Sequence, residues 1–345
     1  MRNNTRLLYT AMLANIATIY GVPSAADTFS VDPTIQQRLE AVIQESSEFL
    51  TRINFVPVVE QSGSKVGIGV GSPIASTRNT AVAGPRVPRD VTTTDDELYF
   101  CAKVNYDTAL PYAKMDQWAH KKEFETIVRD AIARRQALDR IMIGFNGTSR
   151  AATSNILTNP LLQDVAVGWL QKYRTNAAAR VMDEGAPGDG SIYVGTGAGT
   201  HYKNVDALVM DAIANMIAPW YQKDPGLVAI LGRNLLHDKY FPLVNKDQTP
   251  TERLAADVML SQERVGGVPA LSVPYFPDNA ILVTRLDNLS IYTQEGSRRR
   301  RIVDNASMDQ VEDYQSANED WVVEDYAAGC LIENIELLAD GVAAP

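Results

Sequence analysis

Cysteine and histidine are scarce in this sequence, and their scarcity excludes several kinds of site. The chain has two cysteines, Cys101 and Cys330, and three histidines among 345 residues. The cysteines are too far apart for a CxxC pair, and no HExxH pattern or Cys/His cluster with zinc spacing occurs. We therefore expect no metal site and two buried free thiols, as is usual in a reducing compartment.

Long apolar runs are also missing. No stretch of about 18 apolar residues is present, so we predict no membrane contact through a spanning helix. The N-terminal segment RNNTRLLYTAMLANIATIYGVPSAADTF places Leu8, Met12, Ile16 and Ile19 at helical spacing, and Gly21 ends the pattern. We interpret it as a detachable or docking helix followed by a hinge; an ordinary core helix and a secretory signal are the alternatives.

Recognisable catalytic and cofactor-binding motifs are equally absent. There is no GxSxG elbow, and GTGAGT at 195–200 departs from GxGxxG because Thr200 takes the place of the third glycine. Adjacent carboxylates such as Glu312 and Asp313 would point to opposite faces of a strand, whereas a catalytic dyad must converge. We predict no enzyme activity and no cofactor; an α/β enzyme of unknown substrate is a minor alternative.

Charge is distributed unevenly along the chain. Residues 302–345 contain eleven Asp or Glu and no Lys or Arg, which leaves +1 for residues 1–301 because the whole chain carries −10. At the border, GSRRRRIVDN sets four consecutive arginines, 298–301, beside this acidic tail. A nucleic-acid-binding protein usually spreads its basic residues over one face, so the isolated run favours protein contacts over a DNA-binding module.

The arginine run predicts a strand with two different faces. Arg298 and Arg300 would face one side, while Arg299 and Arg301 would face the other. We predict inter-subunit contacts from this run, in which one pair braces its own domain and the other reaches carboxylates of a neighbouring subunit's tail; a solvated edge strand kept from aggregating by its charge is the alternative. The candidate carboxylates are Glu312, Asp313, Glu319, Asp320, Glu324 and Asp325.

Residues 61–96 differ in composition from the rest. These 36 residues hold five Gly, three Pro and many Ser and Thr, and an excursion of this length indicates a functional arm. The alternation in KVGIGV, with Val66, Ile68 and Val70, together with a return strand in ELYFCAKVNYDTALPY, predicts a two-stranded hairpin. Because such a ribbon is marginally stable alone, we expect these three residues to contact another subunit.

Helical periodicity is strongest over residues 114–145. The apolar stripe includes Phe124, Ala131, Ile141 and Phe145, and predicts one helix of about 48 Å. Residues 205–293 then alternate helices and strands, including a helix over 251–261, and form an expected α/β unit. The segment WVVEDYAAGCLIENIEL, 321–337, predicts a final long strand and turn. We expect this tail to return to the first part of the chain, which otherwise lacks strand partners.

Several segments resemble the major capsid proteins of P-two-like tailed bacteriophages. They include QESSEFLTRINFVPV, RRQALDRIMIGFNG, NPLLQDVAVGWLQKYR, PWYQKDPGLV and WVVEDYAAGC, and the similarity runs in order along most of the chain. The resemblance implies an α+β, HK-ninety-seven-type capsid fold. It divides the chain into an N-terminal assembly segment (1–30), an N-arm (31–60), an E-loop (61–96), a peripheral domain (97–204, with spine helix 114–145), an axial domain (205–293) and peripheral return strands (294–345).

The same resemblance implies a structural function. Copies would form the pentamers and hexamers of an icosahedral head around double-stranded DNA, with a scaffolding protein that is also the maturation protease, and with a portal protein at one vertex. We expect removal of the N-terminal segment near Phe29 and Ser30, where the hinge would expose extended chain. The alternative within this fold is an encapsulin-like shell that holds a cargo enzyme.

Overall fold

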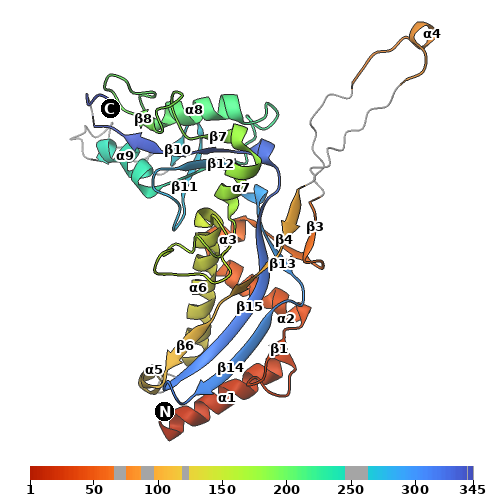
Figure 1. Ribbon diagram of the computed structural model, residues 1–345, viewed down its shortest axis with the longest axis vertical. Helices are drawn as coiled ribbons and strands as arrows, with labels where there is room; N and C mark the ends of the chain where they lie inside the picture. The colour runs from red at the N-terminus through yellow and green to blue at the C-terminus, as the bar shows by residue number, and fades with distance from the viewer. Residues whose placement is uncertain (66–74, 87–96, 119–123, 245–262, 340, 345) are drawn as a thin grey trace, which may run out of the picture.

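The computed structural model describes residues 1–65, 75–86, 97–118, 124–244, 263–339 and 341–344 (Figure 1). The molecule is elongated: one sheet with its helices lies toward the N-terminal end, and a second sheet lies toward the C-terminal end. The mostly antiparallel sheets and the separate helices confirm the α+β class. No helix in the described ranges is long and apolar enough to cross a membrane.

The larger sheet is organised around one long strand. Its strand order is β1-β14-β15-β13-β2, and β5 and β6 also pair with β15. The strands are β1 (Phe29–Ser30), β2 (Asn54–Val58), β5 (Ala102–Asn105), β6 (Thr108–Pro111), β13 (Leu289–Gln294), β14 (Arg299–Asn305) and β15 (Gln310–Val323). The acidic tail does return to this part of the chain, because β15 supplies the antiparallel partner of the two strands that follow the excursion. The returning strand is not the one expected over 321–337, since that segment contributes only the last residues of β15.

Helices pack on one face of this sheet. They are α2 (Pro33–Glu45), α3 (Glu48–Arg52), α5 (Tyr112–Trp118), α6 (Phe124–Asn146) and α7 (Trp169–Asn176). The predicted helix over 114–145 corresponds to α5 and α6, and residues 119–123 lie outside the described residues. Gly144 fits only without a side chain, since a Cβ there would approach the Trp169 ring to 2.2 Å. Helix α7 thus packs closely against the end of α6.

One face of α6 differs from the predicted apolar stripe. Ala131 is exposed, whereas Gln136 and Arg140 are buried together with Ile141 and Phe145. These buried positions recur at helical spacing, so they form one continuous face toward the sheet. The prediction for Ala131 was wrong, because the small apolar area of an alanine side chain carries little information about burial.

The second sheet has the order β10-β11-β9-β12-β16-β7. Its elements are β7 (Val181–Met182), β9 (Leu227–Leu231), β10 (Arg264–Val265), β11 (Val268–Ser272), β12 (Ile281–Arg285) and β16 (Cys330–Ile332), with helices α8 (Val205–Met216) and α9 (Arg233–Val244). All five residues of β9 are buried, and β9 pairs parallel with β11. A strand covered on both faces reads as an unbroken apolar run.

The predicted boundary of this unit at residue 293 needs correction. Strand β13 pairs with β15 and β2 in the larger sheet, while β16 from the tail and β7 complete the second sheet. The chain passes between the sheets through η2 (Leu286–Asn288) and through η3 (Tyr326–Ala328). A change in amino-acid composition along the sequence cannot show where the chain passes from one sheet to the other. The helix expected over 251–261 lies outside the described residues.

Smaller elements complete the described chain. Helix α1 (Asn3–Tyr20) confirms the predicted N-terminal helix and ends at Gly21, which adopts φ +63°. Strand β3 (Ser62–Ser64) pairs with β4 (Leu98–Phe100) at the base of the predicted hairpin, and α4 (Thr80–Ala83) stands away from the body in Figure 1. The remaining elements are η1 (Ala178–Arg180) and the parallel pair β8 (Ile192–Val194) and β17 (Ile335–Leu337).

Both cysteines are free and buried, as predicted. Burial raises the pKa of Cys101 and of Cys330 to about 12. Neither thiol would ionise appreciably at neutral pH, so both are chemically inert in the folded chain.

Candidate assembly surfaces

The arginine run alternates between two environments, as its strand spacing predicts. Arg298 is 3% exposed and Arg300 is largely covered, whereas Arg299 and Arg301 are exposed. Strand β14 carries these side chains in register with β15, where Arg299 lies opposite Ser316 and Arg301 opposite Tyr314. Two arginine side chains of the run therefore point into the molecule, and two point outward.

The inward pair is fully engaged within the chain. Arg298 donates to Glu40 (2.7 Å) and to the side-chain oxygens of Gln136 and Gln315 (both 3.1 Å). Arg300 binds Asp313 through two parallel hydrogen bonds, of 3.0 and 2.8 Å. Arg298 and Arg300 are thus the pair that braces its own chain, and a contact of these two with a neighbouring subunit stays a prediction.

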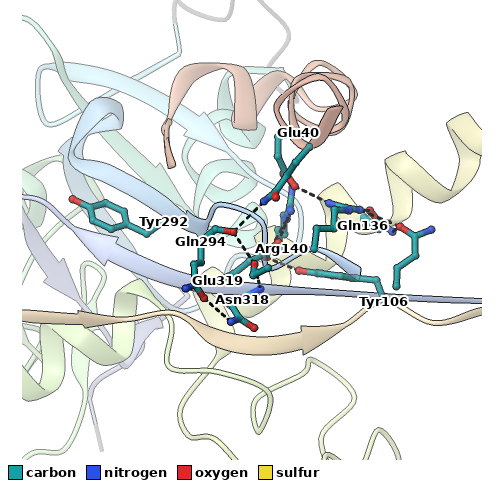
Figure 2. A network of polar contacts seen from close by, with 12 residues as sticks. Glu40, Tyr106, Gln136, Arg140, Tyr292, Gln294, Asn318 and Glu319 are labelled. Carbon is teal, nitrogen blue, oxygen red and sulfur yellow. Dashed lines mark hydrogen bonds and ion pairs between the residues drawn. The ribbon is translucent and has the colours of Figure 1, made fainter. Parts of the chain in front are cut away.

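A second charged centre lies beside this pair, under α2 (Figure 2). Arg140 of α6 and Glu319 of β15 are both 0% exposed and form an ion pair, and Tyr106 donates to Glu319 Oε2 at 2.7 Å. Glu40 of α2 lies 2.6 Å from Arg140 through its second oxygen. One carboxylate thus bridges two buried arginines that come from α6 and from the start of β14.

The electrostatics of this network are balanced. Burial alone would raise the pKa of Glu40, but Arg140 and Arg298 outweigh it and hold that pKa below its usual value. Burial opposes the charge of Arg140 as well, yet Glu319 and Glu40 raise its pKa. Two cations and two carboxylates share the site, so it ties three elements together without a net charge.

Most of the predicted carboxylates have partners in the same chain. Asp320 lies 2.8 Å from Lys172, Glu324 accepts from Tyr292, and Asp325 caps η3 through Ala327 N. Glu312 accepts from three side chains, those of Asn305, Gln310 and Tyr314. The inter-subunit role predicted for Asp313, Glu319 and Asp320 was wrong, since these three are buried. The role of Glu312, Glu324 and Asp325 between subunits stays a prediction.

Basic side chains are exposed on the outward face of β14. Arg299, Arg301 and Lys103 line a shallow hollow of about 380 Å³ over β14, β15 and β5, together with Asp107 and Tyr314. Arg301 donates one hydrogen bond to the backbone oxygen of Ala26 (3.1 Å). This surface suits a carboxylate-bearing partner.

A buried lysine, which the sequence analysis did not identify, anchors the start of the excursion of residues 61–96. The Lys65 side chain is 3% exposed, and its ammonium donates to the Val323 backbone oxygen (2.6 Å) and to Glu97 (3.2 Å). It also lies 5.3 Å from the centre of the Tyr326 ring. Lys65 thus joins the excursion to the point where β15 leads into η3. Val66, Ile68 and Val70 lie outside the described residues.

The expected processing position lies in a strand. Phe29 pairs with Arg300 and Ser30 with Arg299 in the antiparallel β1–β14 ladder, and Val31 N donates to Arg298 O at 2.9 Å. Helix α1 packs beside them, and the ring centres of Tyr20 and Phe29 lie 5.2 Å apart in a tilted arrangement. The chain here is extended and Ser30 is exposed, as expected, but backbone pairing with the arginine strand orders it.

Metal-binding geometry is not seen in the part of the chain that the structure describes. No group of three or more His, Cys, Asp or Glu residues there could hold a metal ion. The glycine loop 195–200 packs against the C-terminal residues, since a Cβ on Gly197 would lie 1.7 Å from Val342 O. Its glycines therefore serve close backbone packing.

Comparison with known proteins places these surfaces in context. Residues 8–335 match the family described as "Phage major capsid protein, P2 family". The chain is 51% identical over 342 residues to the "Capsid proteins" of Escherichia phage P2, covering 98% of this chain and 96% of that protein. It is 42% identical to the "Major capsid protein" of Serratia phage KSP20, covering 97% of both.

Solved structures of capsid chains are also similar to this chain. A chain in "Satellite phage P4 procapsid including size determination (Sid) protein" is 49% identical and superposes with a TM-score of 0.81, covering 99% of both chains. A capsid chain of a native GTA particle is 18% identical with a TM-score of 0.50, over 84% of this chain and 91% of that one. The second likeness concerns the fold alone.

Proposed function

Because this chain belongs to the P2 family of phage major capsid proteins, we propose that its copies close into the pentamers and hexamers of an icosahedral head. It is a structural protein of the virion capsid and not an enzyme. Its fold is the HK-ninety-seven-type phage capsid fold. The observation that carries the proposal is the 49% identity over 99% of the chain to a subunit of an assembled procapsid.

The parts of the molecule have distinct roles in this proposal. The larger sheet with α6 serves as the peripheral domain, and the second sheet with α8 and α9 serves as the axial domain. The excursion of residues 61–96, including Val66, Ile68 and Val70, reaches the next subunit. Partners beyond the chain itself are a scaffolding protein that is also the maturation protease, a portal protein and the enclosed double-stranded DNA.

The contents of purified shells distinguish a phage head from a shell that holds a cargo enzyme. Nuclease-treated heads from infected cells should release double-stranded DNA when they are opened, and their interior should hold no cargo enzyme. An encapsulin-like shell is not favoured by the comparisons. Shells that enclose a folded enzyme and no protected DNA would support that alternative instead.

The outward arginines should contribute to contacts between subunits. Replacing Arg299 and Arg301 by Gln should lower the salt concentration at which empty shells dissociate, since each exposed pair contributes about 0–1 kcal/mol and recurs at every interface. Light scattering during a salt titration measures this midpoint. The control is the thermal midpoint of the dispersed subunit, which should not change. Variant shells that assemble like the parent but package less DNA would show that these arginines face the genome.

Maturation should remove the N-terminal segment near Phe29 and Ser30. Because β1 is paired with β14, cleavage requires local opening of this edge, so the dispersed folded subunit should be cut slowly. Mass spectrometry of mature heads should find most subunits beginning close to this position. Intact Met1 or Arg2 in most subunits of mature heads would refute processing.

A further inference from the structure

Residues 148–165, between α6 and α7, form a loop that exposes apolar side chains; we call it the Leu157 loop. Leu157 is 90% exposed, Ile156 67% and Leu161 36%. Single apolar side chains on a surface need no explanation, but three within six residues form a concentrated apolar surface.

The loop is ordered by its own hydrogen bonds. Thr148 N and Ser149 N donate to Gln163 O at 2.8 and 3.1 Å, and Ala151 N donates to Asp164 O at 2.8 Å. Asn155 N donates to the Asp164 carboxylate at 2.8 Å. Such order lets the exposed side chains bind without a large loss of loop entropy.

Packing fixes the far side of the loop. Leu162 adopts φ +57°, an uncommon conformation for a residue with a side chain, and packs against the main hydrophobic core. Its neighbour Leu161 points to solvent instead. The core therefore holds the base of the loop while the tip displays its apolar residues.

The absence of charged side chains from the loop indicates which kind of partner it would bind. Residues 151–163 contain no charged side chain, although 21% of the chain is charged. Arg150, at the start, is tied down by hydrogen bonds to Lys103 O (2.9 Å) and Val165 O (3.2 Å). A surface without cations does not suit nucleic acid, whereas depletion of charge is typical of the centre of a protein interface.

We propose that the tip of the Leu157 loop, residues 154–161, contacts a second copy of this chain in the shell. The inference rests on the proposed function and adds a surface to it. A ring of identical subunits needs two different complementary surfaces on each copy. In Figure 1 the yellow-green loop after α6 lies on the side of the molecule away from α4, where Val82 is 85% exposed. The chain therefore exposes apolar side chains on two different sides, at Val82 of α4 and at the Leu157 loop.

Cysteine labelling tests the contact directly. A Leu157→Cys variant can be treated with a maleimide as dispersed subunits and as closed shells; the native thiols stay silent because both are buried. Position 157 should react rapidly in the subunit and about tenfold or more slowly in shells, as expected for a residue covered by an interface. Dissociating the shells should restore the fast rate, which controls for oxidation of the thiol.

The outcomes separate the possible partners. Equal labelling rates in subunits and shells would overturn the inference, and protection found only in shells that contain scaffold would assign the loop to that protein. As a second variant, Leu157→Asp should keep the subunit's thermal midpoint, because the side chain is exposed, and should lower shell yield. Parental yield of Leu157→Asp shells would contradict the contact. If the parent chain forms no shells, the proposed function fails and the inference fails with it.

Discussion

Replacing Arg140 by Met should lower the free energy of unfolding of the subunit by about 3–5 kcal/mol, because it leaves a buried carboxylate without its partner. Glu319 is 0% exposed, and Arg140 together with Tyr106 supplies its hydrogen bonds. Glu40 would also lose one of its two arginines. Urea unfolding of the dispersed subunit, followed by circular dichroism, measures the change.

Two controls define the cause of this loss. Arg299→Met removes an exposed arginine and should change the free energy of unfolding by no more than about 0.5 kcal/mol. The double variant Arg140→Met, Glu319→Leu removes both charges and should recover part of the loss, since an apolar pair has no unpaired charge. Parental stability of Arg140→Met would show that the buried network does not hold α2, α6 and β15 together.

Deleting residues 63–88 should abolish closed heads while leaving soluble subunits or capsomers. The deletion removes most of the excursion, whose backbone and apolar residues are proposed to bind a neighbour, and it also removes Lys65 from its buried site. Negative-stain electron microscopy and sedimentation of the expressed variant measure the result.

A point variant separates the two effects of that deletion. Lys65→Met removes the ammonium that binds Val323 O and Glu97 but keeps the excursion at full length. If the excursion itself carries assembly, this variant should still form shells, although its subunit is less stable. Normal heads from the 63–88 deletion would contradict a role of the excursion in closing the shell.

Features governed by local periodicity could be predicted from the sequence. The alternation of the arginine run is the clearest case: Arg298 and Arg300 do face one side, and Arg299 and Arg301 the other. The N-terminal helix, Asn3–Tyr20, is confirmed in the same way. In both, a period of two or of 3.6 residues carries the information.

Features governed by contacts between distant elements could not be predicted. Glu319 and Asp320 were predicted to face a neighbouring subunit, because charged residues on a strand are usually exposed, yet Glu319 meets Arg140 from 179 residues away. Lys65 is hidden for the same reason, since nothing near it in the sequence indicates that its partner is the end of β15. An apolar pattern cannot mark a buried arginine, and so Gln136 and Arg140 were missed on the inner face of α6.

Electron microscopy of the chain expressed with its scaffolding protein tests the central claim most directly. The account predicts closed icosahedral shells in which each subunit is surrounded by others, with labelling of Leu157→Cys suppressed and the excursion bound to a neighbour. Compact, stable monomers at high protein concentration, with no shells in the presence of scaffold, would contradict it.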